Sequence, residues 1–218
     1  MQVNSKCGNS RRSLLRAANY ALALIGLLSL PAYAESMEER LKATLATPAT
    51  RTAAVVAGKK AAFFCVNCHG DDGISKQSDV PNMAGQHPVY LFGELQKFAN
   101  GQRRDEFMQG LMKLINDTDR LNMAVYYASL DAKPAGTTTS TAGRDLYAKL
   151  CVACHGERAQ GSEKFPRLAG QQVAYLKNSL TRYRNRSGNR IDPGMAAVTT
   201  GLKDLDVSEL AIYLSAMR

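Results

Sequence analysis

Two short stretches of this 218-residue chain carry residue types that bind metals and cofactors. The first is Cys-Val-Asn-Cys-His at residues 65–69, and the second is Cys-Val-Ala-Cys-His at residues 151–155. Two thiols followed by an imidazole are able to hold a zinc ion, to form a redox-active disulfide, or to attach a haem covalently. The surroundings of the two motifs decide among these three chemistries.

Zinc and disulfide chemistry both fit the surroundings poorly. A zinc site with four cysteines often draws its second pair from about 15–20 residues away. Here the two pairs are 86 residues apart, and each has its own His. A thioredoxin-like pair would lie near a βαβ pattern, and the flanking sequence shows none.

Haem attachment accounts for every residue of the motif. On a helix, positions i, i+3 and i+4 share one face, so both thiols reach the haem vinyl groups while the His meets the iron. The sequence therefore predicts two covalently bound haem c groups. Their thioether anchors are Cys65, Cys68, Cys151 and Cys154, and their proximal iron ligands are His69 and His155.

The second axial ligand of each iron has to come from elsewhere in the chain. The one remaining His is His87, and Gln172 stands at its matching place in the repeat, which disfavours His/His ligation. Methionine is the alternative. After His155 the chain has only Met195 and Met217, and the penultimate position of Met217 suits the core or a fraying helix end better. Met195 is the predicted ligand of the second haem.

An internal repeat transfers this assignment to the first haem. Met108 lies 87 residues before Met195, and a Tyr follows each of them by 18 residues, at Tyr126 and Tyr213. Met108 is therefore the predicted ligand of the first haem. Three other methionines in this half of the chain remain alternatives: Met83, Met112 and Met123.

The repeat also defines the domain organisation. The segment at 83–91 recurs at 168–176, and a Pro-, Gly- and Thr-rich stretch separates the copies. We expect an N-terminal domain over 50–132, a linker over 133–141 and a C-terminal domain over 142–218.

Each copy has the same predicted elements and no confident strand, so the expected fold class is all-α. A first helix leads into the Cys motif (52–65; 141–151), and a second helix follows Ala-Gly-Gln (89–100; 173–184). A loop then carries the Met, and a closing helix has apolar residues at helical spacing. We expect Asp206 and Glu209 to form a capping box at the start of the second closing helix.

Residues 1–34 are typical of a secretory signal peptide. A basic start precedes an uncharged apolar run that is short for a membrane span, and Ala-Tyr-Ala ends it before Glu35. Cleavage after about Ala34 would leave four cysteines, all in the two motifs, and 24 Lys and Arg against 19 acidic residues. We therefore expect an exported, soluble protein of the periplasm.

Together these motifs resemble the two-haem cytochrome c4 family over about residues 50–218. The resemblance rests on the two Cys-x-x-Cys-His units, Pro-x-x-Ala-Gly-Gln and a Met before the last helix. It implies tandem class I cytochrome c domains with His/Met iron, and proximal histidines that donate a hydrogen bond to the carbonyls of Pro81 and Pro166. It also implies a close helix packing contact at Gly143. In the first copy Gly58 is one residue out of step, so that the same contact is in doubt there.

The charge is unevenly distributed along the chain. Residues 50–132 have nine basic and nine acidic residues, whereas residues 133–218 have thirteen and seven. Much of the excess lies in 177–190, at Lys177, Arg182, Arg184, Arg186 and Arg190. Export and covalent haem argue against nucleic-acid binding. The basic segment is therefore either a solvated face or a docking surface for an acidic partner.

The uneven charge also predicts a difference between the two haems. Nearby positive charge favours reduced iron, so we expect the C-terminal haem to have the higher reduction potential.

The leading hypothesis is an electron carrier without catalytic activity, serving redox protein partners such as a donor complex and a terminal oxidase. The alternative is the cytochrome subunit of a periplasmic dehydrogenase, for instance a flavin-dependent sulfide-oxidising enzyme. A haem peroxidase would need an open iron site, which a Met ligand closes. A redox partner could also attach the protein to the surface of the membrane.

Overall fold

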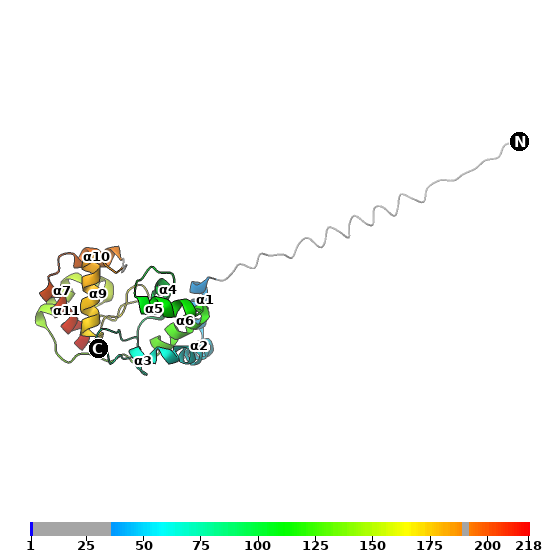
Figure 1. Cartoon of the computed structure of the whole chain (residues 1–218), viewed down its shortest axis with the longest axis horizontal. Coiled ribbons are helices and arrows are strands. Elements are labelled where there is room, and N and C mark those ends of the chain that lie inside the picture. The colour runs from blue at the N-terminus through cyan, green and yellow to red at the C-terminus, as the bar shows by residue number, and fades with distance from the viewer. Residues whose placement is uncertain (2–35, 189–191) are drawn as a thin grey trace. The chain divides into compact units, whose positions relative to one another are not determined.

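The computed structural model describes Met1, residues 36–188 and residues 192–218. Helices are the only regular secondary structure in these ranges, which confirms the predicted all-α class (Figure 1). The helices are α1 Met37–Ala46, α2 Pro48–Ala61, α3 Val66–His69, α4 Pro88–Ala99, α5 Glu106–Leu114, α6 Asp117–Ala128, α7 Thr141–Leu150, α8 Val152–His155, α9 Val173–Asn185, α10 Pro193–Thr199 and α11 Asp204–Ala216. A short 3₁₀ turn, η1, spans Ala62–Phe64. None of the described helices is long and apolar enough to cross a membrane.

The predicted signal peptide is almost entirely outside the described residues, which omit 2–35. Contacts group Met37–Arg218 into one compact unit. Within that unit, helices up to α6 gather on one side and α7 to α11 on the other (Figure 1).

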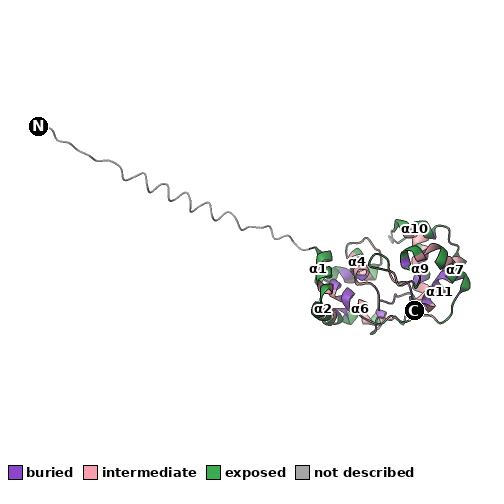
Figure 2. Cartoon of the chain, turned by 180° about the vertical axis from the view of Figure 1, so that it is seen from behind, coloured by how far each residue is buried: buried purple, intermediate pink, exposed green. Residues whose placement is uncertain are grey.

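Two hydrophobic cores repeat the same helix packing. In the first, α6 packs against α2 and α4, and α4 packs against α5. In the second, α11 packs against α7 and α9, and α9 packs against α10. The closing helix of each core has a buried face (Figure 2), because most of its apolar residues face the two helices that cross it. The Cys motifs follow α2 and α7, and Cys65 and Cys151 pack against the cores of their own copies.

Gly58 and Gly143 make the helix crossings possible in both copies. A Cβ at Gly143 would lie 2.1 Å from the backbone oxygen of Glu209, and one at Gly58 would lie 2.0 Å from that of Asn122. The sequence offset cast doubt on the Gly58 contact, and that doubt was wrong. Gly58 is one residue closer to its Cys motif than Gly143 is. The turn η1 between α2 and the Cys motif accommodates this shorter spacing, so Gly58 still packs against the closing helix α6.

Three local predictions need correction. The methionines lie on short helices, α5 and α10, and not on loops. The closing helix begins earlier than expected, so Lys203 is its N-cap and the Asp206 carboxylate accepts from Lys203 N at 2.8 Å. Glu209 instead accepts a hydrogen bond from the Ser140 hydroxyl, which ties α11 to the start of α7.

The first copy has an additional helix that sequence periodicity did not reveal. Helix α1 packs against α2 and buries Leu41, which is 2% exposed, in the first core. Structure that belongs with the N-terminal domain therefore begins before residue 50. The stretch predicted as a linker has no regular structure before Thr141, which begins α7, and its backbone is held by hydrogen bonds from Ala135 N to Gly170 O and from Gly136 N to Ser215 O.

Candidate haem-binding sites

Each Cys-x-x-Cys-His motif folds as a single helical turn. The His69 amide donates to Cys65 O at 2.9 Å, and the His155 amide donates to Cys151 O at 3.0 Å. Gly70 and Gly156 end the turns with φ of +81° and +76°, a conformation that glycine adopts without strain. The turn therefore brings two thiols and one imidazole to the same side of the backbone, as covalent haem attachment requires.

All four thiols of the motifs are free. Burial raises the pKa of the Cys65 thiol, and it raises the pKa of Cys151 to about 11. Redox-active cysteine pairs depend on a lowered pKa and a stable thiolate, so this environment argues against a disulfide-exchange site. The described residues also contain no cluster of three or more His, Cys, Asp or Glu side chains that would hold a metal ion.

Both proximal-histidine candidates are buried and oriented by a proline carbonyl. His69 Nδ1 lies 2.9 Å from Pro81 O, and His155 Nδ1 lies 3.0 Å from Pro166 O. Because a carbonyl only accepts, Nδ1 carries the hydrogen and Nε2 keeps a lone pair. Burial lowers the pKa of both histidines, and the carbonyl contacts partly oppose that effect. A neutral imidazole with a free Nε2 is the form that ligates iron.

Asp105 and Asp192 hold the two methionine candidates in place. Each is the N-cap of the short helix that carries the Met, and its carboxylate accepts from the Met backbone N–H, at 3.0 Å for Met108 and 2.8 Å for Met195. The two aspartates were not recognised from the sequence. The repeat contains the signal, because an Asp precedes each Met by three residues.

We expect Asp192→Ala to loosen Met195. Loss of an N-cap costs about 1 kcal/mol of helix stability, so if Met195 is the iron ligand, its bond to iron should open roughly fivefold more often. The measurement is the rate at which added cyanide replaces Met at the C-terminal haem of the oxidised protein. Asp192→Asn keeps a capping oxygen and should leave that rate near that of the unchanged chain, so equal acceleration by both variants would contradict the capping role.

One large cavity receives all the candidate cofactor residues. It has a volume of about 1090 Å³ and is lined by both cysteines and the His of each motif, together with Met108, Met195, Met83, Met112 and Met123. Ordinary small-molecule pockets measure roughly 300–1,000 Å³. Most of the wall is apolar, and its thiols and imidazoles are those that haem attachment uses. The residues therefore fit two haem groups.

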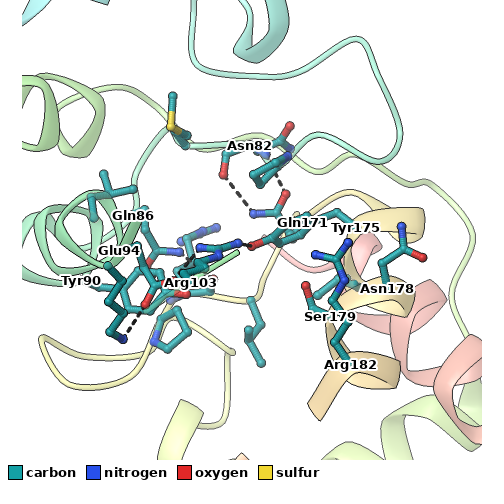
Figure 3. Close-up of a pocket in the computed structure, with 18 of the residues that line it drawn as sticks. Asn82, Gln86, Tyr90, Glu94, Arg103, Gln171, Tyr175, Asn178, Ser179 and Arg182 are labelled. Carbon is teal, nitrogen blue, oxygen red and sulfur yellow. Dashed lines mark hydrogen bonds and ion pairs between the residues drawn. The ribbon is translucent and has the colours of Figure 1, made fainter. Parts of the chain in front are cut away.

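The cavity also contains polar groups from both halves of the chain (Figure 3). Arg103 pairs with Glu94 at 2.6 Å, and both side chains are largely buried. The Arg103 guanidinium also donates to the Tyr175 hydroxyl at 3.1 Å and lies 4.4 Å from the centre of the Phe98 ring. These contacts place a positive charge, compensated by Glu94, in the lining of the cavity that both motifs share.

The chain is similar to known proteins in sequence and in structure. Residues 140–218 match the family model for cytochrome c. Cytochrome c4 from Thiocapsa roseopersicina is 30% identical over 172 residues, which cover 72% of this chain and 89% of the relative. A thiosulfate dehydrogenase electron acceptor from Thiomonas intermedia (strain K12) is 31% identical over 172 residues, which cover 71% of this chain and 79% of the relative. The crystal structure of reduced recombinant cytochrome c4 from Pseudomonas stutzeri matches with a TM-score of 0.70 and 27% identity, over 75% of this chain and 98% of the other.

These similarities agree with the repeated architecture and with the chemistry of the two motifs. They confirm the tandem class I cytochrome c domains, and the cofactor is two covalently bound haem c groups. The protein carries electrons and depends on redox protein partners, and it is not itself a catalytic enzyme. The chain belongs to the cytochrome c4 family of two-haem electron-transfer proteins.

Proposed function

We propose that this chain is a periplasmic carrier that passes single electrons between respiratory partners through two His/Met haems. One observation carries the proposal. The histidine of each motif is buried with Nδ1 bound to a proline carbonyl, and its Nε2 is left for an iron in a cavity that a methionine of the same repeat also lines. A methionine ligand raises the potential and fills the sixth position, which suits electron transfer.

The repeat supports one ligand set in each domain. His69 and Met108 would hold the first iron, and His155 and Met195 would hold the second. The thioether bonds would form at Cys65, Cys68, Cys151 and Cys154. The hydrogen bonds to Pro81 and Pro166 would fix each imidazole and increase its basicity toward iron.

Export is part of the same proposal. Residues 1–34 would serve as the signal peptide, and the mature chain would carry the domains at 50–132 and 142–218, joined by 133–141, with α1 packed against the first of them. N-terminal sequencing of protein from a periplasmic extract should begin at about Glu35. A mature chain that retained the basic residues near position 11 would contradict this.

The proposed docking surface for an acidic partner is the basic segment 177–190, which includes the later part of α9 and its C-cap. Lys177 and Arg182 on α9 and the C-cap residue Arg186 are exposed, and complementary charge would speed encounter. Arg184 belongs less to this surface, because it donates to Leu202 O at 3.0 Å and pairs with Asp204 at 2.8 Å. Arg190 lies outside the described residues. A donor complex and a terminal oxidase remain the proposed partners.

A second candidate function is that of an electron-accepting subunit of a dehydrogenase. The relative from Thiomonas intermedia, described as a thiosulfate dehydrogenase electron acceptor, supports this version. A flavin-dependent sulfide-oxidising enzyme is another dehydrogenase of this class. Purification of the chain in a stable complex with a dehydrogenase would favour this second function, and purification alone would favour the free carrier.

Potentiometric titration of the holoprotein tests the leading proposal. It should show two one-electron steps, and the C-terminal haem should be reduced first, because residues 133–218 have a net charge of +6 and residues 50–132 have none. A difference of 59 mV would correspond to about 1.4 kcal/mol. A single titrating haem would contradict the two-haem carrier, and earlier reduction of the N-terminal haem would contradict the electrostatic argument.

A further inference from the structure

Two glutamine side chains clamp the backbone of the opposite domain in the same manner. Gln171 Oε1 accepts from Asn82 N at 2.7 Å, and Gln171 Nε2 donates to Asn82 O at 2.9 Å (Figure 3). In the mirrored contact, Gln86 Oε1 accepts from Arg167 N at 2.7 Å, and Gln86 Nε2 donates to Arg167 O at 2.9 Å. Both glutamines are 7% exposed, so these bonds are sheltered from water.

The clamped residues are those that directly follow Pro81 and Pro166. The N–H of Asn82 and the carbonyl of Pro81 therefore belong to one peptide group. That carbonyl faces His69 Nδ1 at 2.9 Å, and the N–H faces Gln171. The same geometry joins His155, the Pro166–Arg167 peptide group and Gln86. A chain of two hydrogen bonds thus runs from each proximal histidine into the other domain.

Hydrogen bonds in such a chain polarise one another. A peptide group whose N–H donates becomes a stronger acceptor at its carbonyl, by about 10–30% per bond in condensed-phase estimates. A stronger acceptor at Nδ1 makes the imidazole a more basic ligand and favours oxidised iron. The effect on iron therefore depends on a side chain that the other domain supplies.

We propose that Gln171 and Gln86 are positioning residues, each of which tunes the haem of the opposite domain through one peptide group. Gln171 acts on His69 through Pro81–Asn82, and Gln86 acts on His155 through Pro166–Arg167. Each glutamine oxygen also accepts from the next backbone N–H, at 3.0 Å for Gln172 and 3.1 Å for His87, which holds the amide in the required orientation. This inference rests on the proposed ligation by His69 and His155.

Other bonds across the same boundary provide a control. Gln172 Nε2 donates to Ser75 O at 2.6 Å and to Asn82 Oδ1 at 3.1 Å, so it joins the domains as Gln171 does. Its side-chain hydrogen bonds go to these two oxygens and not to the N–H or carbonyl of the peptide group between Pro81 and Asn82. Replacing Gln172 therefore loosens the boundary and leaves the hydrogen-bond chain to His69 in place.

The test measures the potential of each haem separately in Gln171→Leu and Gln86→Leu holoproteins, by following the haem methyl resonances during redox titration. Gln171→Leu should favour reduction of the N-terminal haem roughly twofold to fivefold, because its histidine becomes a weaker donor to iron. Gln86→Leu should do so at the C-terminal haem. A tenfold change would correspond to 59 mV. Gln172→Leu should shift neither haem selectively.

The decisive result is a shift in the potential of the haem in the domain opposite to the substitution. A shift confined to the domain that carries the substitution, an equal shift of both haems, or no shift would overturn the proposal. If Gln171→Leu does not fold, Gln171→Met keeps an unbranched side chain without the acceptor oxygen and carries the same expectation. Spectra of the unaltered protein without His/Met haems would contradict the proposed ligands instead, so the two failures are distinguishable.

Discussion

A chain with Met195 replaced by Ala should keep both haems attached and lose Met ligation at the C-terminal haem alone. The thioether bonds depend on Cys151 and Cys154, so attachment does not require the methionine. Loss of the ligand should lower that haem's potential by a sizeable part of the ~0.8 V range that axial ligands span. The near-infrared charge-transfer band of Met-ligated haem, measured with potentiometry, follows both effects.

The mirrored change at Met108 should remove Met ligation at the N-terminal haem alone. Met83→Ala is the matched control, because Met83 lines the same cavity and packs against the first core without an Asp cap on its backbone. That variant should keep both Met bands. A Met108→Ala protein with an unchanged spectrum, or loss of a band in Met83→Ala, would contradict the assignment by repeat register.

Replacing Gly143 with Ala should destabilise the C-terminal domain by about 3 kcal/mol or more. The new Cβ would lie 2.1 Å from Glu209 O and 2.8 Å from Tyr213 Cβ, so α7 and α11 would have to move apart. Gly58→Ala should act similarly between α2 and α6, where Asn122 O lies 2.0 Å from the new atom. Chemical denaturation followed by circular dichroism measures both effects.

Gly93 provides the control for these two changes. It also lies inside a helix, α4, but apart from its chain neighbours and the backbone of its own helix no atom would lie within 4 Å of an added Cβ. Gly93→Ala should therefore stabilise the chain by roughly 0.5–1 kcal/mol, through the higher helix propensity of Ala. If Gly143→Ala were as stable as Gly93→Ala, the close helix crossing would be refuted.

Much of the fold was predictable because the chain contains an internal repeat, and each copy could be compared with the other. The register from Met108 to Met195 also aligns the closing helices, in which Tyr126 and Tyr213 occupy equivalent positions against Gly58 and Gly143. Helical periodicity located α2, α4, α6, α7, α9 and α11 but not α1. The Cys-x-x-Cys-His motifs needed only local geometry, since one helical turn presents all three side chains on one side.

The remaining features depend on contacts that no local pattern encodes. The closing helix begins at Asp204 because the Asp206 carboxylate accepts from the backbone N–H of the N-cap residue Lys203, while Glu209 accepts from the distant Ser140 hydroxyl. Helix α1 is short and mixed in polarity, and its Leu41 gains stability only by burial in the first core. Gln86 and Gln171 were visible as a repeated Ala-Gly-Gln, but their partners lie more than 80 residues away.

Near-infrared magnetic circular dichroism of the oxidised holoprotein, with covalent haem counted by mass spectrometry, tests the central claim most directly. The claim is that this chain carries two haem c groups, each held by one His and one Met of its own domain. The account predicts two attached haems per chain, both low-spin with the His/Met charge-transfer band. A high-spin haem, a bis-histidine haem, or fewer than two attached haems would contradict it.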